Sequence, residues 1–294
     1  IEQYITYPVE IEMANLPGVT EIRSISKFGL SVVTIVFEEE IGTYLPRQLI
    51  AEKIKTATEK IPEGFGTPEM GPITTGLGEI YQYTLEVKPE FKNQYSVTDL
   101  RTIQDWVVKR QLSGIKGVVE INTWGGYLKQ YEIAINPASL KAMNISTADV
   151  FTALEKNNSI AGGSYIEKTN QSYFIRGEGK VNSAQDIENI VVKNDSGLPI
   201  YIKDIAKVQF GHANRFGAIT GNGEGEKVLG QVMMLKGGNS KQVIEDVKHR
   251  VTEIEKTLPE GVYINGFLER SELVGKTTFT VAENLILGCL IVIF

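Results

Sequence analysis

LPGVTEIRSISKFG at residues 16–29 and IKGVVEINTWGG at residues 115–126 carry the same short phrase. It reads GVTEI at 18–22 and GVVEI at 117–121, so its two copies lie 99 positions apart (117 − 18). Before each copy, apolar residues recur with the spacing of an amphipathic helix, and after each copy they alternate as in a strand. Glycine supplies the left-handed turn that ends a helix, and a β-branched residue suits the start of a strand. The phrase therefore predicts the same helix-to-strand junction twice in one chain.

A second phrase repeats downstream of the first. KIPEG at 60–64 and TLPEG at 257–261 each close a stretch with helical spacing, and strand candidates such as residues 262–264 follow. The predicted order is helix, strand, strand, helix, strand in both copies. A further strand at 79–87, EIYQYTLEV, precedes the second copy and completes a βαββαβ unit, whereas the matching strand of the first copy would lie before residue 1.

The two copies differ in length because of an insertion. The distance along the sequence from the glycine of the first phrase to the glycine of the second phrase is 46 residues in copy one (64 − 18). In copy two the same distance is 144 residues (261 − 117). The extra 98 residues (144 − 46) are enough for a small domain, and a loop tolerates such an insertion because its closure entropy grows slowly with length. We predict an α+β fold of two ferredoxin-like βαββαβ units, the second interrupted by an α+β insert at residues 127–218.

The insert has predicted elements of its own. Alternating apolar residues at 131–135 indicate a strand, and a helix is expected from Ser146 or Thr147, as the N-cap, to Asn157. Glycines predict three turns in the insert. They lie at residues 161–163, 177–179 and 195–197.

Composition excludes several classes of function. The net charge is −6, which disfavours a nucleic-acid partner, and the chain contains none of the common hydrolase, nucleotide-binding or zinc-protease motifs. The glycine-rich stretch 221–225 lacks the Lys-Ser/Thr of a phosphate-binding loop and is expected to be a hairpin turn. Cys289 is the single cysteine, and the two histidines, His212 and His249, are expected on the surface. A metal site here must therefore use carboxylates and take further ligands from elsewhere, because a four-ligand zinc site of nitrogen and sulfur cannot be built.

The C-terminal stretch LILGCLIVIF at 285–294 has ten residues without a polar side chain. As a helix it would extend about 15 Å, roughly half the thickness of a bilayer core. We interpret it as the start of a membrane helix. The alternative is a buried C-terminal helix of a soluble domain.

Two carboxylates stand out as candidate ligands. Glu79 is flanked by glycines where copy one meets copy two, and it precedes a strand rich in aromatic residues. Glu120 lies in the GVVEI phrase of copy two. Because Glu21 is its counterpart in copy one, a purely structural role is an alternative for Glu120. For Glu79 the alternative is a solvated side chain at the end of a strand. The pair at 233–234, Met-Met, could offer thioethers to a soft ion or fill a core.

Three stretches carry a resemblance to a known family. They are TTGLGEIYQYTLEV at 74–87, residues 99–137, and YIKDIAKVQFG at 201–211. Together with the order of elements over the whole chain, they resemble the N-terminal periplasmic half of an RND (resistance–nodulation–division) efflux pump. They are most similar to the cobalt–zinc–cadmium type of the heavy-metal branch.

The resemblance implies a domain organisation. Residues 1–78 would form a first porter subdomain without its first strand, and residues 79–126 with 219–270 a second porter subdomain. Residues 127–218 would form a docking subdomain, and residues 271–294 the approach to and start of a transmembrane helix.

The resemblance also implies a function. The chain would not be an enzyme but part of a proton-driven antiporter that exports a divalent cation such as zinc, cobalt or cadmium. It would lie on the periplasmic side of the bacterial inner membrane. The pump would be a homotrimer that works with a periplasmic adaptor protein and an outer-membrane channel. No resident cofactor is implied, since the metal is the substrate.

The resemblance assigns three residues. Glu79 and Glu120 match positions that bind the cation, and Arg23 matches an arginine near the substrate path. Two departures disfavour the copper/silver type: Glu79 stands where that branch has a tryptophan, and Asn214 where it has a methionine. The copper/silver type and a drug-type RND pump with an aromatic pocket remain alternatives, as does a soluble binding module.

Overall fold

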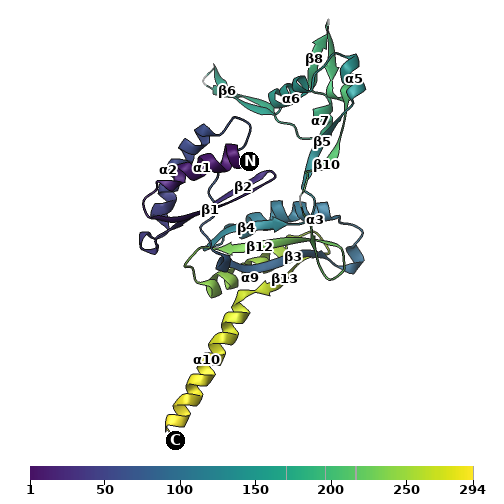
Figure 1. Ribbon diagram of the computed structural model, residues 1–294. Helices are drawn as coiled ribbons and strands as arrows, with labels where there is room; N and C mark the ends of the chain where they lie inside the picture. The colour runs from purple at the N-terminus through teal and green to yellow at the C-terminus, as the bar shows by residue number, and fades with distance from the viewer. Residues whose placement is uncertain (170, 196, 216, 294) are drawn as a thin grey trace. The chain divides into compact units, whose positions relative to one another are not determined.

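The computed structural model describes residues 1–169, 171–195, 197–215 and 217–293, and it confirms the α+β class. The chain divides into two compact units, Ile1–Ile73 and Thr74–Phe294, and each is described by itself (Figure 1).

The first unit packs helices against a β-hairpin. Strands β1 and β2 are antiparallel and continuous in register from Glu21 to Lys27. Helices α1 and α2 cover the hairpin through an apolar cluster that includes Met13 and Ala57. The elements are η1 (Glu2–Thr6), α1 (Tyr7–Ala14), β1 (Val19–Lys27), β2 (Leu30–Phe37), η2 (Glu39–Ile41) and α2 (Tyr44–Lys60).

The repeated glycines adopt the backbone conformation that the sequence predicts. Gly18 and Gly117 have φ of +75° and +91°, and Gly64 and Gly261 both have φ of +85°. At Gly117 a side-chain Cβ would also lie 2.8 Å from a methyl carbon of Val243. The helix-to-strand junction at Gly18 and Gly117 is therefore the same in both copies, as predicted. The strand predicted after Gly64 is wrong: residues 65–75 contain no strand, whereas a strand follows Gly261 at residues 262–269.

A five-stranded antiparallel sheet organises the second unit. Strand β12 pairs with β3 along one edge, and β3 pairs in turn with β13. Along its other edge β12 pairs first with the short β11 and then with β4. The elements are η3 (Gly76–Gly78), β3 (Glu79–Val87), η4 (Pro89–Phe91), α3 (Val97–Ile103), η5 (Gln104–Val108), α4 (Lys109–Leu112), β4 (Val118–Trp124), β11 (Ile219–Thr220), β12 (Glu226–Met234), α9 (Ser240–Glu255) and β13 (Val262–Glu269).

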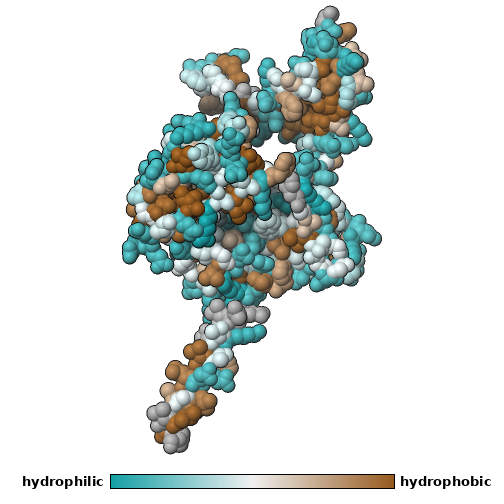
Figure 2. All heavy atoms as spheres, in the orientation of Figure 1, coloured by the Kyte–Doolittle hydropathy of each residue, from teal (hydrophilic) through white to brown (hydrophobic). Residues whose placement is uncertain are grey.

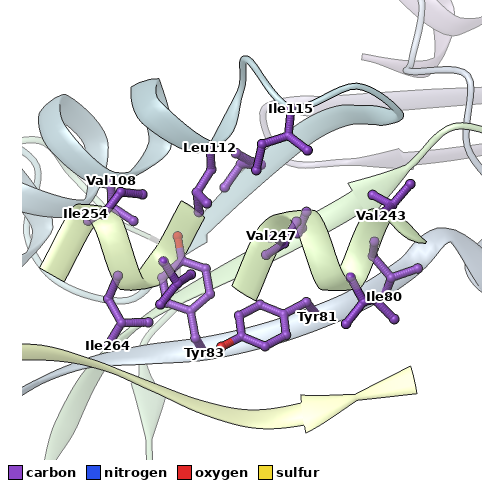
Figure 3. Packing of buried hydrophobic residues seen from close by; sticks show 14 of the residues in the cluster. Ile80, Tyr81, Tyr83, Val108, Leu112, Ile115, Val243, Val247, Ile254 and Ile264 are labelled. Atoms are coloured by element: carbon purple, nitrogen blue, oxygen red, sulfur yellow. The ribbon is translucent and has the colours of Figure 1, made fainter. Parts of the chain in front are cut away.

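The helical segment of residues 97–112 and helix α9 cover the same face of the sheet. Figure 3 shows Val108 and Leu112 from one segment and Val247 from α9 pointing toward Tyr81 and Tyr83 of β3. These side chains belong to one buried apolar cluster. The inward face of the sheet is therefore its core, and the residues that alternate with them point to the opposite face.

One hydrogen-bonded pair is buried in this core. The hydroxyl of Tyr83 donates to Oε1 of Gln104 at 3.0 Å, and both side chains are fully buried. Burial raises the pKa of Tyr83 above its ordinary value, so the hydroxyl stays protonated. Because a buried polar group without a partner is costly, this bond fixes the position of the Tyr83 ring.

The segment between β4 and β11 folds around a separate apolar cluster, which includes Ile202 and Ile205. Ser146 caps α6, as predicted, in a capping box with Asp149. The elements of this segment are β5 (Lys129–Ile135), α5 (Pro137–Ala142), α6 (Thr147–Lys156), β6 (Ser159–Lys168), β7 (Gln171–Gly179), α7 (Ala184–Glu188), β8 (Val191–Asp195), β9 (Leu198–Tyr201), α8 (Ile202–Ile205) and β10 (Ala206–His212).

Two of the three predicted glycine turns in this segment are wrong. Residues 161–163 lie inside β6 and residues 177–179 end β7. A Cβ at Gly163 would overlap the carbonyl oxygen of Ile175, and one at Gly179 would lie 2.6 Å from that of Ser159. These glycines allow the two strands to approach closely rather than turn the chain. The third predicted turn includes Ser196, which lies outside the described residues.

The C-terminal helix α10 (Arg270–Ile293) exposes its apolar side chains. Leu285 is 67 % exposed and Ile291 is 71 % exposed, and Figure 2 shows hydrophobic atoms along the surface of this helix. The alternative of a buried C-terminal helix is therefore wrong. Within the described part of the chain, no helix combines the length and the apolar character that a membrane span requires.

Candidate functional site

The two predicted carboxylates lie at one level of the five-stranded sheet. Met233 of β12 is paired with Glu79 on β3 and with Glu120 on β4. Neighbouring strands lie roughly 4.8 Å apart, so the Cα atoms of the two glutamates are separated by two strand spacings, about 10 Å. The sheet thus places one acidic side chain on each side of Met233.

A local irregularity determines the face on which Glu79 lies. The preceding row, Val232 with Tyr81, faces the core, and the pairing then shifts so that Met233 meets Glu79 rather than Ile80. Ile80 and Tyr81 both belong to the core cluster, which is the signature of a β-bulge. The bulge turns Glu79 to the opposite face of the sheet.

Amide side chains occupy the next row on that face. Gln231 is paired with Gln82 on β3 and with Asn122 on β4. The Gln82 amide donates to Oε2 of Glu79 at 3.3 Å, and the Trp124 indole donates to Oε1 of Gln231 at 3.2 Å. We call this surface the acid–amide face. It comprises Glu79, Gln82, Glu120, Asn122, Gln231 and Met233, all of which are partly exposed except Met233, which is buried.

The start of β3 is tied to β12 beside this row. The Thr74 hydroxyl donates to the carbonyl oxygen of Met234 at 2.9 Å. Gly78 ends a short 3₁₀ turn, and a Cβ there would lie 2.9 Å from the same oxygen. The glycines before Glu79 therefore permit a close approach of two backbones, which fixes the level at which the Glu79 side chain leaves the sheet.

The duplicated phrase gives Glu120 an internal comparison. With the offset of 99 residues, Glu21 corresponds to Glu120 and Arg23 to Asn122. In copy one, Arg23 donates two hydrogen bonds to Glu21, at 2.7 and 2.6 Å, and they hold the pKa of that carboxyl below its ordinary value. In copy two the guanidinium is replaced by an amide, and no described side chain forms an ion pair or hydrogen bond with the Glu120 carboxylate. The correspondence between the two copies therefore gives no reason to assign Glu120 a purely structural role, because the arginine that neutralises Glu21 in copy one is replaced in copy two.

The remaining candidates lie elsewhere. Arg23 belongs to the unit Ile1–Ile73, where it is exposed and paired with Glu21. His249 is exposed on α9, as expected, and His212 is exposed at the end of β10, where its ring lies 4.5 Å from that of Tyr127. Among residues 1–169, 171–195, 197–215 and 217–293, no group of three or more histidine, cysteine or acidic side chains is arranged to hold a metal ion. The acid–amide face therefore offers two carboxylates, and the rest of a coordination shell must come from other atoms.

The sequence analysis did not predict that the two neighbouring methionines lie on opposite faces of the sheet. Met234 belongs to the core cluster, whereas Met233 lies outside it, in the row of the two glutamates. The alternation of β12 contains this signal, since Val232 and Met234 both belong to the core cluster and the residue between them must face away.

Comparisons with known proteins agree with this architecture. The family model described as "AcrB/AcrD/AcrF family" matches residues 1–294. The chain is 46 % identical to the cobalt-zinc-cadmium resistance protein CzcA of Cupriavidus metallidurans over 99 % of its length, and 36 % identical to the cation efflux system protein CusA of Escherichia coli K12 over 97 %. A crystal structure of a heavy metal efflux pump superposes with a TM-score of 0.87 at 32 % identity, covering 97 % of this chain. The chain spans 28 % of that CzcA, 27 % of that CusA and 28 % of the crystallised pump.

Proposed function

Since the chain belongs to the AcrB/AcrD/AcrF family, we propose that it forms the porter and docking portion of a proton-driven pump that exports a divalent metal cation. The observation that carries this proposal is the placement of Glu79 and Glu120 on either side of Met233, on the face of the sheet opposite the helices. The relatives named for cobalt, zinc and cadmium resistance support the class of cargo. The metal is the substrate of the pump and not a resident cofactor.

The chemistry of the acid–amide face suits such a cargo. Cobalt, zinc and cadmium ions accept carboxylate oxygens, whereas Cu(I) prefers sulfur. Two carboxylates with Cα atoms about 10 Å apart can both reach a cation held between them. Both glutamates are fixed on one sheet, so the cation would be released when ligands from other parts of the pump withdraw and leave an incomplete coordination shell. Further ligands would come from parts of the pump outside this chain.

We assign the subdomains from the order of strands. The sheet order β13, β3, β12, β4 is that of a ferredoxin-like βαββαβ unit, which supports residues 79–126 with 219–270 as the second porter subdomain. Residues 127–218, with their own core, would be the docking subdomain, and residues 1–78 the first porter subdomain. The exposed apolar side chains of α10 support residues 271–294 as the start of a membrane helix.

The assembly follows from the same assignment. The complete pump would be a homotrimer in the bacterial inner membrane, with this portion in the periplasm, and would work with an adaptor protein and an outer-membrane channel. The acids that carry protons would lie in membrane helices outside this chain. Arg23 would lie along the substrate path. It neutralises Glu21 in copy one, whereas Glu120, the corresponding residue of copy two, has no such partner.

The range of substrates tests the proposal. The complete pump that contains this chain, expressed with its adaptor and channel in a bacterial host that lacks metal exporters, is expected to protect growth against zinc, cobalt or cadmium salts. It is expected to give no protection against silver salts or apolar drugs, because the acid–amide face offers oxygen ligands and charge rather than several thioethers or an aromatic pocket. Protection against silver or drugs with none against the divalent ions would refute the proposal.

A further inference from the structure

The geometry points to Met233 as a residue that determines which divalent ion the site prefers. We propose that its thioether sulfur coordinates the cation held by Glu79 and Glu120 and biases the site toward cadmium, the softest of the three cargo ions considered. This inference rests on the proposed function and deepens it.

Met233 lies between the two glutamates. It is the middle residue of a row on three adjacent strands, with Glu79 on β3 and Glu120 on β4. The pairing shifts on both sides of it, between residues 232 and 233 toward β3 and between 233 and 234 toward β4. The shift toward β3 places Glu79 rather than Ile80 beside Met233, whereas Glu120 lies beside it by regular pairing that continues from Trp124.

Met233 is shielded from solvent. Its side chain is 8 % exposed although it points away from the helices and lies outside the hydrophobic core cluster. A thioether is a weak donor that competes poorly with water, so a shielded sulfur is a better ligand than an exposed one. Met234, by contrast, is packed in the core and pairs with Val118. Filling the core therefore explains Met234 but does not explain Met233.

The row of Glu79, Met233 and Glu120 combines oxygen and sulfur donors. Two carboxylates supply the charge that any of the divalent ions requires, and they discriminate little among cobalt, zinc and cadmium. A neutral sulfur adds nothing to the charge but favours the softer ion. The combination of two oxygens and one sulfur therefore predicts a pump that holds all three ions and favours cadmium.

The test uses the complete pump in proteoliposomes, with cadmium and zinc transport measured in parallel. Met233→Leu keeps the apolar volume and removes the sulfur, so it is expected to lower the apparent affinity for cadmium relative to zinc by about tenfold or more, the order of magnitude for loss of an interaction at a metal site. Met234→Leu is the matched control, since it removes a sulfur from the core next to the site, and it is expected to leave the ratio unchanged. An unchanged ratio in Met233→Leu would overturn the inference.

X-ray absorption at the cadmium edge gives an independent readout. The complete pump loaded with cadmium alone is expected to show one sulfur neighbour, which Met233→Leu removes and Met234→Leu keeps. A shell of oxygen and nitrogen alone in the unmodified pump would contradict the inference. A failure of the proposed function differs from a failure of the inference about Met233. If the proposed function is wrong, Glu79→Gln leaves zinc and cadmium transport intact, whatever the methionine variants do.

Discussion

Replacing Glu79 with Gln in the complete pump is expected to abolish protection against zinc, cobalt and cadmium while leaving the protein folded. Gln keeps the size and hydrogen-bonding capacity of the side chain but removes the charge that holds a dication. Loss of groups at a metal site typically lowers metal affinity by about 10- to 100-fold. Glu120→Gln is expected to give the same phenotype, because each carboxylate supplies half of the protein charge in the row. The measurement is growth in graded metal salt together with the amount of pump in the membrane.

A sharper variant leaves both carboxylates in place. Asn122→Arg recreates in copy two the arrangement of Glu21 and Arg23, and it is expected to neutralise Glu120 and inactivate the pump as Glu120→Gln does. Glu245→Gln, on the exposed surface of α9, is the control that changes the same charge away from the site. If Glu79→Gln, Glu120→Gln and Asn122→Arg all export like Glu245→Gln, the acid–amide face does not handle the cargo.

The second large effect concerns the strand that carries the site. A Cβ at position 230 would overlap the ring of Tyr83, which is fully buried and held by its bond to Gln104, so the ring cannot move aside without cost. Gly230→Ala is therefore expected to lower the free energy of unfolding by about 3 kcal/mol, the upper part of the range for overpacked cores. Both tryptophans, Trp106 and Trp124, lie in the unit Thr74–Phe294, so their fluorescence during urea unfolding reports on this unit.

The control for this prediction is another glycine of the same unit. Gly114→Ala introduces a Cβ that meets no atom within 4 Å, and φ at this position is not positive. It is expected to unfold near the urea concentration of the unmodified chain. Equal midpoints for Gly230→Ala and Gly114→Ala would show that the packing of Tyr83 against β12 is not rigid.

Repeated phrases in the sequence predict most of the fold. GVTEI and GVVEI locate the junctions at Gly18 and Gly117, and the unequal spacing to the two PEG phrases reveals the insertion. Glycine is harder to interpret inside the insert, because close approach of strands and a turn call for the same residue. This ambiguity produced the wrong turns at 161–163 and 177–179.

The sequence predicts the two carboxylates of the candidate site but not how they are arranged. Glu79 and Glu120 are named from sequence, yet strict alternation from Tyr81 and Tyr83 would turn Glu79 into the core. The bulge at Ile80 reverses this direction, and a single extra residue in a strand leaves no trace in composition or periodicity. Pairing across strands that are more than 100 residues apart also cannot be read from local pattern, which is why the position of Met233 emerged only from the structure.

Anomalous X-ray scattering from crystals of the complete pump, grown with zinc or cadmium, would locate the cargo ion. We expect a peak between the carboxylates of Glu79 and Glu120, above Met233, that disappears in Glu79→Gln. A strong peak elsewhere in the porter region, with none at this row and none lost in that variant, would contradict this expectation.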